Sequence, residues 1–140
     1  MKSQVKEKWI AALRSGEYDQ GVGGLRTLTR FCCLGVLCDL YSKETGIEWN
    51  YKYISEGHPV NGFEFDGQRN FLPSSVVEWS GLETSSPEIN ILVPEEEDED
   101  GEYVYTQVLA EEYGYTQVLA ELNDNGENFF KIADLIEENF

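Results

Sequence analysis

Residues 30–41 read RFCCLGVLCDLY, the longest apolar run of the chain, and they hold all three cysteines. Apolar side chains in this run recur at the spacing that places them on one face of an α-helix. They are Cys33, Val36, Leu37, Leu40 and Tyr41. The run therefore predicts a central helix over residues 33–44, closed by Gly46. Gly35 costs a helix about 1 kcal/mol relative to alanine, so we expect a close neighbour at that point.

Shorter patterns on both sides of this helix predict an α+β domain. The other helical patterns are residues 3–15, 72–81 and 129–138, with Ser3 and Asn128 as the N-terminal caps of the first and last. The strand patterns are residues 25–31, 48–54, 62–66 and 88–93. Helices and strands are segregated rather than alternating. Residues 1–140 therefore predict a single small domain of about four helices packed on a short, mostly antiparallel sheet.

The last third of the chain holds an acidic run and a tandem duplication. Residues 94–104 include six successive acidic residues and predict a self-repelling surface loop. Residues 102–111 (EYVYTQVLAE) recur as residues 112–121 (EYGYTQVLAE). A shift of ten residues turns a helix by roughly 80° from a whole number of turns, so both copies cannot present one face in a straight helix. We expect the second copy to be helical and the first to be a strand or a peripheral extension.

Length and cysteine content bound the class of protein. A chain of 140 residues fits one domain. No window approaches the ~20 apolar residues of a membrane span, and the N-terminal residues contain no apolar signal core. Three cysteines, two of them adjacent, do not form a disulfide framework. These features predict a cytoplasmic protein with reduced thiols and no membrane partner.

The net charge of −17 is unevenly distributed. Residues 94–140 carry 15 acidic residues and one basic residue, whereas residues 1–30 carry six basic and three acidic residues. Such a field repels nucleic acid over most of the surface, so direct nucleic-acid binding is not expected. An anionic ligand would be attracted only by the N-terminal part.

A candidate anion site follows from this asymmetry. The glycine-rich loop at residues 21–24 and the start of the helix near Cys32 could offer backbone N–H groups to a phosphate. The glycine spacing matches neither a P-loop nor a dinucleotide fingerprint, and a plain turn is the competing interpretation. The candidate ligand-binding side chains are Arg14, Arg26 and Arg30 for phosphates, Tyr18, Trp49 and Tyr51 for stacking, and Asn123 and Asp124 for a ribose or base. The aromatics could equally serve the core, and Asn123 and Asp124 a helix C-cap and turn.

The cysteines suggest a second, weaker chemistry. Cys32 and Cys33 lie at a predicted helix N-terminus, where the helix dipole lowers a thiol pKa, and His58 could act as a base in a Cys-dependent hydrolase. Free cysteine is also among the most buried residue types, and Cys33 falls on the apolar face. Cys32, Cys33, Cys38 and His58 show no recognised zinc spacing. We therefore expect no catalytic residue, no metal and no cofactor.

Four motifs occur in a fixed order along the chain. They are WxxALxxG at residues 9–16, FCCLGVLCD at 31–39, LPxxVxxWxGL at 72–82, and LAELNDNG at 119–126 followed by IADLIE at 132–137. In this order they resemble a family of small phage and prophage accessory proteins with no assigned activity. The resemblance covers most of the chain. The duplication at residues 102–121 departs from the family pattern.

The resemblance implies a viral accessory protein acting in a host bacterial cytoplasm, where such proteins are often counter-defence factors. Together with the arginines and aromatics, it favours a non-catalytic protein that sequesters a small anionic, nucleotide-derived signalling molecule. The alternatives are an acidic protein-directed inhibitor or DNA mimic that acts on a host defence protein through residues 95–100, and a Cys-dependent hydrolase. The sequence leaves a homo-oligomer open.

Overall fold

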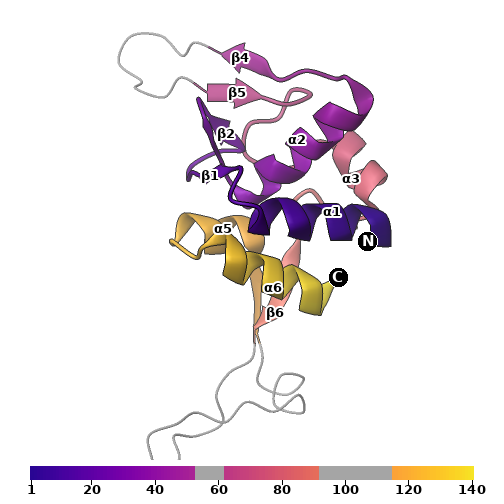
Figure 1. The fold of residues 1–140 in the computed structure, drawn as a ribbon, viewed down its shortest axis with the longest axis vertical. Coiled ribbons are helices and arrows are strands. Elements are labelled where there is room, and N and C mark those ends of the chain that lie inside the picture. The colour runs from indigo at the N-terminus through magenta and orange to yellow at the C-terminus, as the bar shows by residue number, and fades with distance from the viewer. Residues whose placement is uncertain (53–61, 92–114) are drawn as a thin grey trace, which may run out of the picture.

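A computed structural model describes residues 1–52, 62–91 and 115–140 and shows an α+β arrangement (Figure 1). Within these residues the chain forms five helices and seven short strands, which confirms the predicted fold class. Helix α2 lies against a five-stranded sheet in one half of the molecule (Figure 1). In the other half α6 lies along α1, and α5 and the paired strands β6 and β7 adjoin α6, while α5 also contacts α2. Residues 53–61 and 92–114 are outside the described part, and they include His58, the acidic run predicted to be a loop, and the first copy of the duplication.

Helix α2 (Cys33–Thr45) is the predicted central helix. Every residue from Cys33 to Cys38 is buried, so its first two turns are surrounded by protein on all sides. The close neighbour expected at Gly35 is the backbone of Leu25, whose carbonyl oxygen would lie 1.8 Å from a Cβ atom at position 35. Glycine is therefore required there by packing, which outweighs its poor helix propensity.

The five-stranded sheet has the order β1-β3-β2-β5-β4. Its strands are β1 (Asp19–Gln20), β2 (Arg26–Thr27), β3 (Arg30–Phe31), β4 (Asn50–Lys52) and β5 (Gly62–Glu64). All pairings are antiparallel except β1 with β3. The single strand predicted for residues 25–31 is wrong, because the chain reverses at Leu28, which has a φ of 50°, and forms the β2–β3 hairpin instead.

Three further helices pack against α2 or against one another. They are α1 (Ser3–Arg14), α3 (Ser74–Ser80) and α6 (Phe129–Asn139). Asn128 caps α6 as predicted, since its side chain accepts a hydrogen bond from the Lys131 N–H. The cap of α1 was predicted one residue late: Lys2 is the N-cap, because its N–H donates to the Ser80 carbonyl and holds it extended.

The second copy of the duplication is not a continuous helix, which corrects the prediction. Its described part forms strand β7 (Tyr115–Val118), paired antiparallel with β6 (Glu88–Ile91), and then the start of α5 (Leu119–Asp124). Pairing with β6 supplies hydrogen-bond partners for backbone that helical spacing alone would have placed in a helix.

A single core joins both halves. Trp9, Leu25, Leu37, Phe65 and Ile132 are among its fully buried side chains. Trp9 donates from Nε1 to the Cys33 carbonyl at 2.9 Å, so α1 is tied to the first turn of α2. None of the helices in the described ranges has both the length and the apolar character of a transmembrane helix.

Candidate functional site

Four of the eight predicted ligand residues lie around one surface, which we call the Arg26 surface. Strand register places Phe31, Arg26, Phe63 and Tyr51 directly opposite one another on successive strands β3, β2, β5 and β4. Residues opposite one another in a sheet point to the same face, so these four form a row across it. Trp49 contacts the same row, with its ring 5.9 Å from Phe31 and 6.4 Å from Phe63. We define the Arg26 surface as these five residues.

The guanidinium of Arg26 is surrounded by aromatic rings. Its Cζ lies 3.9 Å from the Phe63 ring centroid, 5.0 Å from Phe31 and 5.6 Å from Trp49, all within cation–π range. Arg26 Nε donates to the Leu28 carbonyl at 3.0 Å, so the β2–β3 turn orients the side chain. Among the described residues no carboxylate pairs with this half-buried cation.

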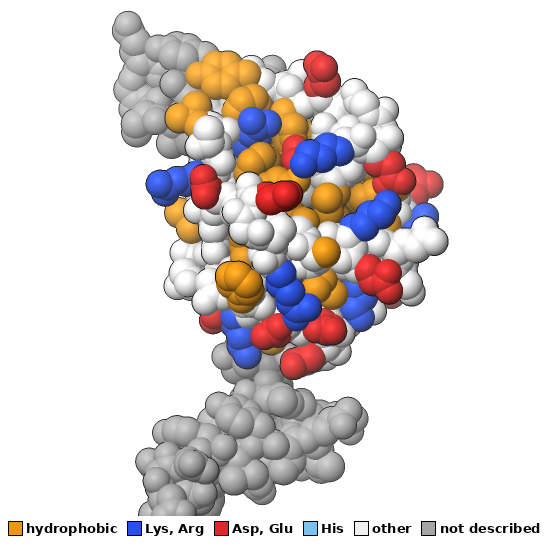
Figure 2. All heavy atoms as spheres, viewed as in Figure 1, with side chains coloured by type: hydrophobic (Ala, Val, Ile, Leu, Met, Phe, Trp, Pro, Cys, Tyr) orange, Lys and Arg blue, Asp and Glu red, His pale blue; other side chains and the backbone are white. Residues whose placement is uncertain are grey.

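Figure 2 shows hydrophobic side chains exposed beside Lys and Arg side chains over the β4–β5 and α2 part of the molecule. Tyr51 is 50% exposed and its ring meets Phe63 edge-on at 5.4 Å. Trp49 is only partly exposed, because it also packs edge-on against the buried Phe65 at 4.9 Å. The predicted stacking role therefore suits Tyr51 better than Trp49.

Beneath this surface the carboxylate of Asp39 holds two of the predicted aromatics. The Tyr18 hydroxyl donates to Asp39 Oδ2 at 2.6 Å, and Trp49 Nε1 donates to Oδ1 at 3.1 Å. Lys43 Nζ lies 3.4 Å from the same carboxylate and donates to the Tyr18 hydroxyl at 3.1 Å. Burial, followed by the bond to Asp39, raises the pKa of Tyr18, so it stays a neutral donor. Asp39 fixes these rings in place.

The other two predicted arginines lie elsewhere. Arg14, on α1, pairs with Asp134 at 2.6 Å and Glu137 at 2.9 Å on α6, and these hydrogen bonds raise its pKa. Arg30 is exposed and lies opposite Thr27, the neighbour of Arg26 on β2. Because successive strand residues alternate in direction, Arg30 points away from the Arg26 surface. The structure does not bring the three arginines together.

Asn123 is a buried connector rather than an exposed polar group. It is fully buried, and its Oδ1 accepts from the Cys33 N–H at 3.1 Å and from Gln20 Nε2 at 2.9 Å. Its Nδ2 donates to the Gly21 carbonyl at 2.8 Å. With the Cys32 thiol, which accepts from the Gly35 N–H, it occupies donors at the start of α2 that were considered for a phosphate.

Asp124 follows in the chain and is exposed at the end of α5. Its Oδ1 accepts from the Gly23 N–H at 3.2 Å, so it holds the glycine-rich loop. Asp124 lines a cleft of about 390 Å³ together with Gly23, Gly24 and Phe71. This cleft and the Arg26 surface share no residue, so Asp124 and Arg26 do not form one site.

The three thiols are buried and unreactive as nucleophiles. Desolvation raises the pKa of Cys32 to about 11 and the pKa values of Cys33 and Cys38 well above their usual range. The expected lowering by the helix dipole is therefore outweighed by burial. In the described ranges no three His, Cys, Asp or Glu side chains converge as a metal site would require.

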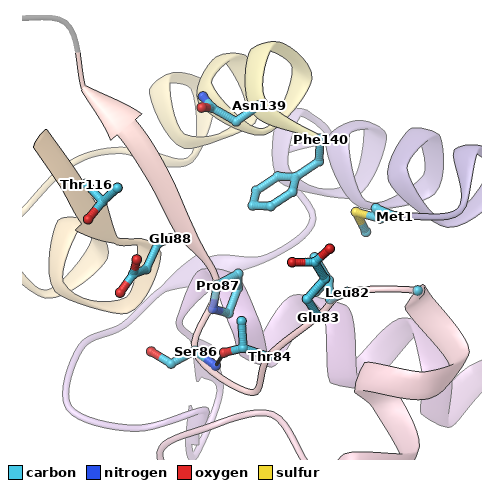
Figure 3. A pocket seen from close by; sticks show the side chains of 11 residues that line it. Met1, Leu82, Glu83, Thr84, Ser86, Pro87, Glu88, Thr116, Asn139 and Phe140 are labelled. Atoms are coloured by element: carbon cyan, nitrogen blue, oxygen red, sulfur yellow. Dashed lines mark hydrogen bonds between the residues drawn. The ribbon is translucent and has the colours of Figure 1, made fainter. Parts of the chain in front are cut away.

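A larger cavity of about 580 Å³ lies beside the segment that joins α3 to β6, near both ends of the chain (Figure 3). Glu83 and Glu88 border it, and the Ser86 N–H donates to Thr84 Oγ1 at 2.8 Å on its wall. None of the predicted ligand residues lines this cavity. Its two carboxylates make it unsuited to an anion.

Sequence reasoning missed Phe31 and Phe63 on the Arg26 surface and Asp39 beneath it. Phe63 could have been found from the alternation of Gly62 to Asp66, once paired with the strand that contains Tyr51. The register that aligns Phe31 with Arg26 could not, because it depends on the reversal at Leu28.

Comparison with known protein families finds a match over the whole chain. The family described as a domain of unknown function (DUF8296) matches residues 1–140. No curated protein and no solved structure is similar enough to match.

Proposed function

The chain belongs to the DUF8296 family, a domain of unknown function, and we propose that it is a non-catalytic binding protein that sequesters a small anionic, nucleotide-derived signalling molecule on the Arg26 surface. In this proposal the setting is the cytoplasm of a bacterium infected by a phage, and the effect is to counter a host defence that uses the molecule as its signal. The setting rests on the resemblance of the four sequence motifs to small phage accessory proteins.

The observation that carries the proposal is the environment of Arg26. The chain has a net charge of −17, yet this half-buried guanidinium meets three aromatic rings and no carboxylate in the described part of the chain. Among the described residues, only the Leu28 carbonyl accepts from this side chain, and it uses the Nε–H. The terminal N–H groups are thus available to a phosphate, which guanidinium groups bind in a bidentate manner.

The residues around Arg26 fit the remaining parts of a nucleotide. Tyr51 is half exposed at the edge of the row and offers a ring on which a base can stack. Phe63 supports both Arg26, at 3.9 Å, and Tyr51, at 5.4 Å, so the cation and the stacking ring are held side by side. Asp39 acts as a positioning residue for Trp49 and Tyr18 beneath them.

The absence of a reaction in this proposal is supported by the state of the thiols. A thiol nucleophile must reach its thiolate form, and burial opposes this at all three cysteines. Beneath the Arg26 surface the Tyr18 hydroxyl and the Asp39 carboxylate are already bonded to each other. Binding without turnover is what these groups can perform.

The test is calorimetry with a panel of cyclic nucleotides, cyclic oligonucleotides and ADP-ribose derivatives. We expect at least one to bind the wild type, and Arg26→Gln to weaken it by roughly 10–100-fold, since a charged hydrogen bond to phosphate is lost. Arg30→Gln is the matched control, because it removes the same charge from the opposite face of the sheet. Tyr51→Ser should weaken binding by roughly tenfold through lost stacking.

The outcomes separate this proposal from the acidic-inhibitor alternative. If no compound of the panel binds the wild type, or if Arg26→Gln and Arg30→Gln weaken binding equally, the ligand does not bind on the Arg26 surface. Capture of a host defence protein that is abolished by neutralising Glu95 to Asp100, residues outside the described part, would favour the inhibitor instead.

A further inference from the structure

We propose that a second and independent site, the Asp124 cleft, binds a small planar organic cation such as an amidinium or a protonated amino-heterocycle. The cleft has a volume of about 390 Å³, within the range of small-molecule sites. The residues that carry the argument are Gly23, Gly24, Cys32, Phe71, Glu121 and Asp124. They come from the glycine-rich loop, the start of α2, the segment before α3, and α5.

The charge of the cleft selects a cation. Its lining includes the carboxylates of Glu121 and Asp124 and no Lys or Arg side chain. Neither carboxylate forms an ion pair within the described residues. The thiol of Cys32 lies at the buried floor with its pKa raised to about 11, so the floor is neutral and the two carboxylates set the potential.

One of these carboxylates is fixed in position while keeping acceptor capacity. Asp124 Oδ1 accepts from the Gly23 N–H at 3.2 Å and lies 3.5 Å from Asn123 Nδ2, which is itself buried and bonded. Oδ2 makes no hydrogen bond to the described residues. It can therefore accept from an N–H of a ligand, with no cost for ordering the side chain.

The shape of the cleft favours a flat group. Gly23 and Gly24 present backbone without side chains on one wall, so a planar molecule can approach closely. Phe71 lines the cleft and is 48% exposed, and the face of an aromatic ring attracts a cation. An anion would be repelled by the two carboxylates, and the N–H groups of Cys33 and Gly35 at the start of α2 already donate to Asn123 and to the Cys32 thiol.

The probe for the test is 4-aminobenzamidine, whose fluorescence rises when it leaves water. We expect wild-type protein to bind it with a dissociation constant on the order of 0.1–1 mM, as suits a ligand of that size. The neutral isostere 4-aminobenzamide and the anion 4-aminobenzoate have the same shape, and we expect neither to bind measurably. Added salt should weaken the binding of the cation.

Isosteric variants locate the site. Asp124→Asn keeps an Oδ1 acceptor for the Gly23 N–H while removing the charge. Glu121→Gln removes the other negative charge, on α5, and keeps the shape of the side chain. We expect each to weaken 4-aminobenzamidine binding roughly fivefold, and the double variant roughly twentyfold or more. Glu138→Gln, an exposed acid on α6, is the matched control and should leave binding unchanged.

The proposal is overturned if 4-aminobenzamide binds as tightly as the amidinium, if Asp124→Asn and Glu121→Gln match the wild type, or if the probe does not bind at millimolar concentration. Phe71→Ser separates a cleft from simple surface attraction, because it should weaken the probe by roughly fivefold without changing charge. The nucleotide panel used for the Arg26 surface tests a ligand of opposite charge at different residues. Failure of one proposal leaves the other standing.

Discussion

Two polar groups set in apolar surroundings, Asn123 and Arg26, serve the molecule in different ways. Every hydrogen-bonding atom of the Asn123 amide is used by the protein, through Cys33, Gln20 and Gly21. Arg26 donates from Nε to the Leu28 carbonyl, and within the described ranges no protein acceptor binds its terminal N–H groups. Buried polar groups are normally satisfied, so complete satisfaction indicates a structural role, and an unused charged donor indicates a ligand. Both were predicted as ligand residues, and only their surroundings distinguish them.

The largest effect should come from Asn123→Ala. It leaves the Cys33 N–H and the Gly21 carbonyl without partners in a fully buried position, and we expect the free energy of unfolding to fall by roughly 3 kcal/mol. Urea unfolding followed by tryptophan fluorescence measures this. Asn125→Ala, two residues along and exposed, should change it by less than about 0.5 kcal/mol. A loss below that of Asn125→Ala would remove the distinction between the two regions.

The next effect concerns the contact that joins both regions. Gly35→Ala places a Cβ atom 1.8 Å from the Leu25 carbonyl oxygen, and Leu25 precedes Arg26 in the chain. We expect a loss of about 2 kcal/mol, because the backbone must move and the gain in helix propensity is smaller. Gly24→Ala is the control, since its Cβ atom would meet the Arg69 carbonyl at an ordinary 3.5 Å. A stable Gly35→Ala variant with unchanged unfolding would contradict the close approach.

The sequence predicted most of the fold because its signals are local. The apolar period of α2, the caps at Asn128 and Gly46, and the need for a neighbour at Gly35 all follow from residues within one turn of each other. The errors occurred where pairing with a distant strand decides the secondary structure. The reversal at Leu28 divides the single predicted strand into β2 and β3. In the second copy of the duplication, predicted as helix, residues 115–118 instead form β7 and pair with β6.

The site was harder to predict for the same reason. Composition identified arginines and aromatics, but it could not show that Arg14 faces Asp134 and Glu137, 120 and more residues away. Tyr18, Trp49, Tyr51 and Arg26 were brought together only by strand register and by Asp39. Non-local contacts of this kind leave no period in a sequence.

A smaller effect on stability should appear at alkaline pH through Cys32, which is the N-cap of α2 and also lines the Asp124 cleft. The folded-state pKa of Cys32 is raised to about 11 from 9.0 by burial, so its contribution to stability is complete below about pH 9 and is lost as the pH rises through about 11. At about pH 10 the loss in the free energy of unfolding, relative to neutral pH, is about 1.4 kcal/mol. Cys32→Ser retains an acceptor for the Gly35 N–H and does not titrate.

Urea unfolding at neutral pH and at about pH 10 should therefore show a smaller loss of stability for Cys32→Ser than for wild type, by about 1.4 kcal/mol. Cys33 and Cys38 remain in both proteins, and burial, the first cause of their raised pKa values, acts on them in both. An identical pH dependence of the two proteins would show that Cys32 is not desolvated in the folded state. The start of α2 would then not be the closed, satisfied region inferred from Asn123.

The smallest effect on stability is expected for the two arginines, and it sharpens the comparison most directly. Arg14→Gln removes an exposed double ion pair, so its cost should be visible at low salt and shrink at high salt. Arg26→Gln removes cation–π contacts, and its cost of about 0.5–1 kcal/mol should change little with salt. Urea unfolding at both salt concentrations measures the two responses. A cost for Arg26→Gln that shrinks at high salt would mean that carboxylates pair with Arg26. A cation neutralised in this way would not be available to an anionic ligand.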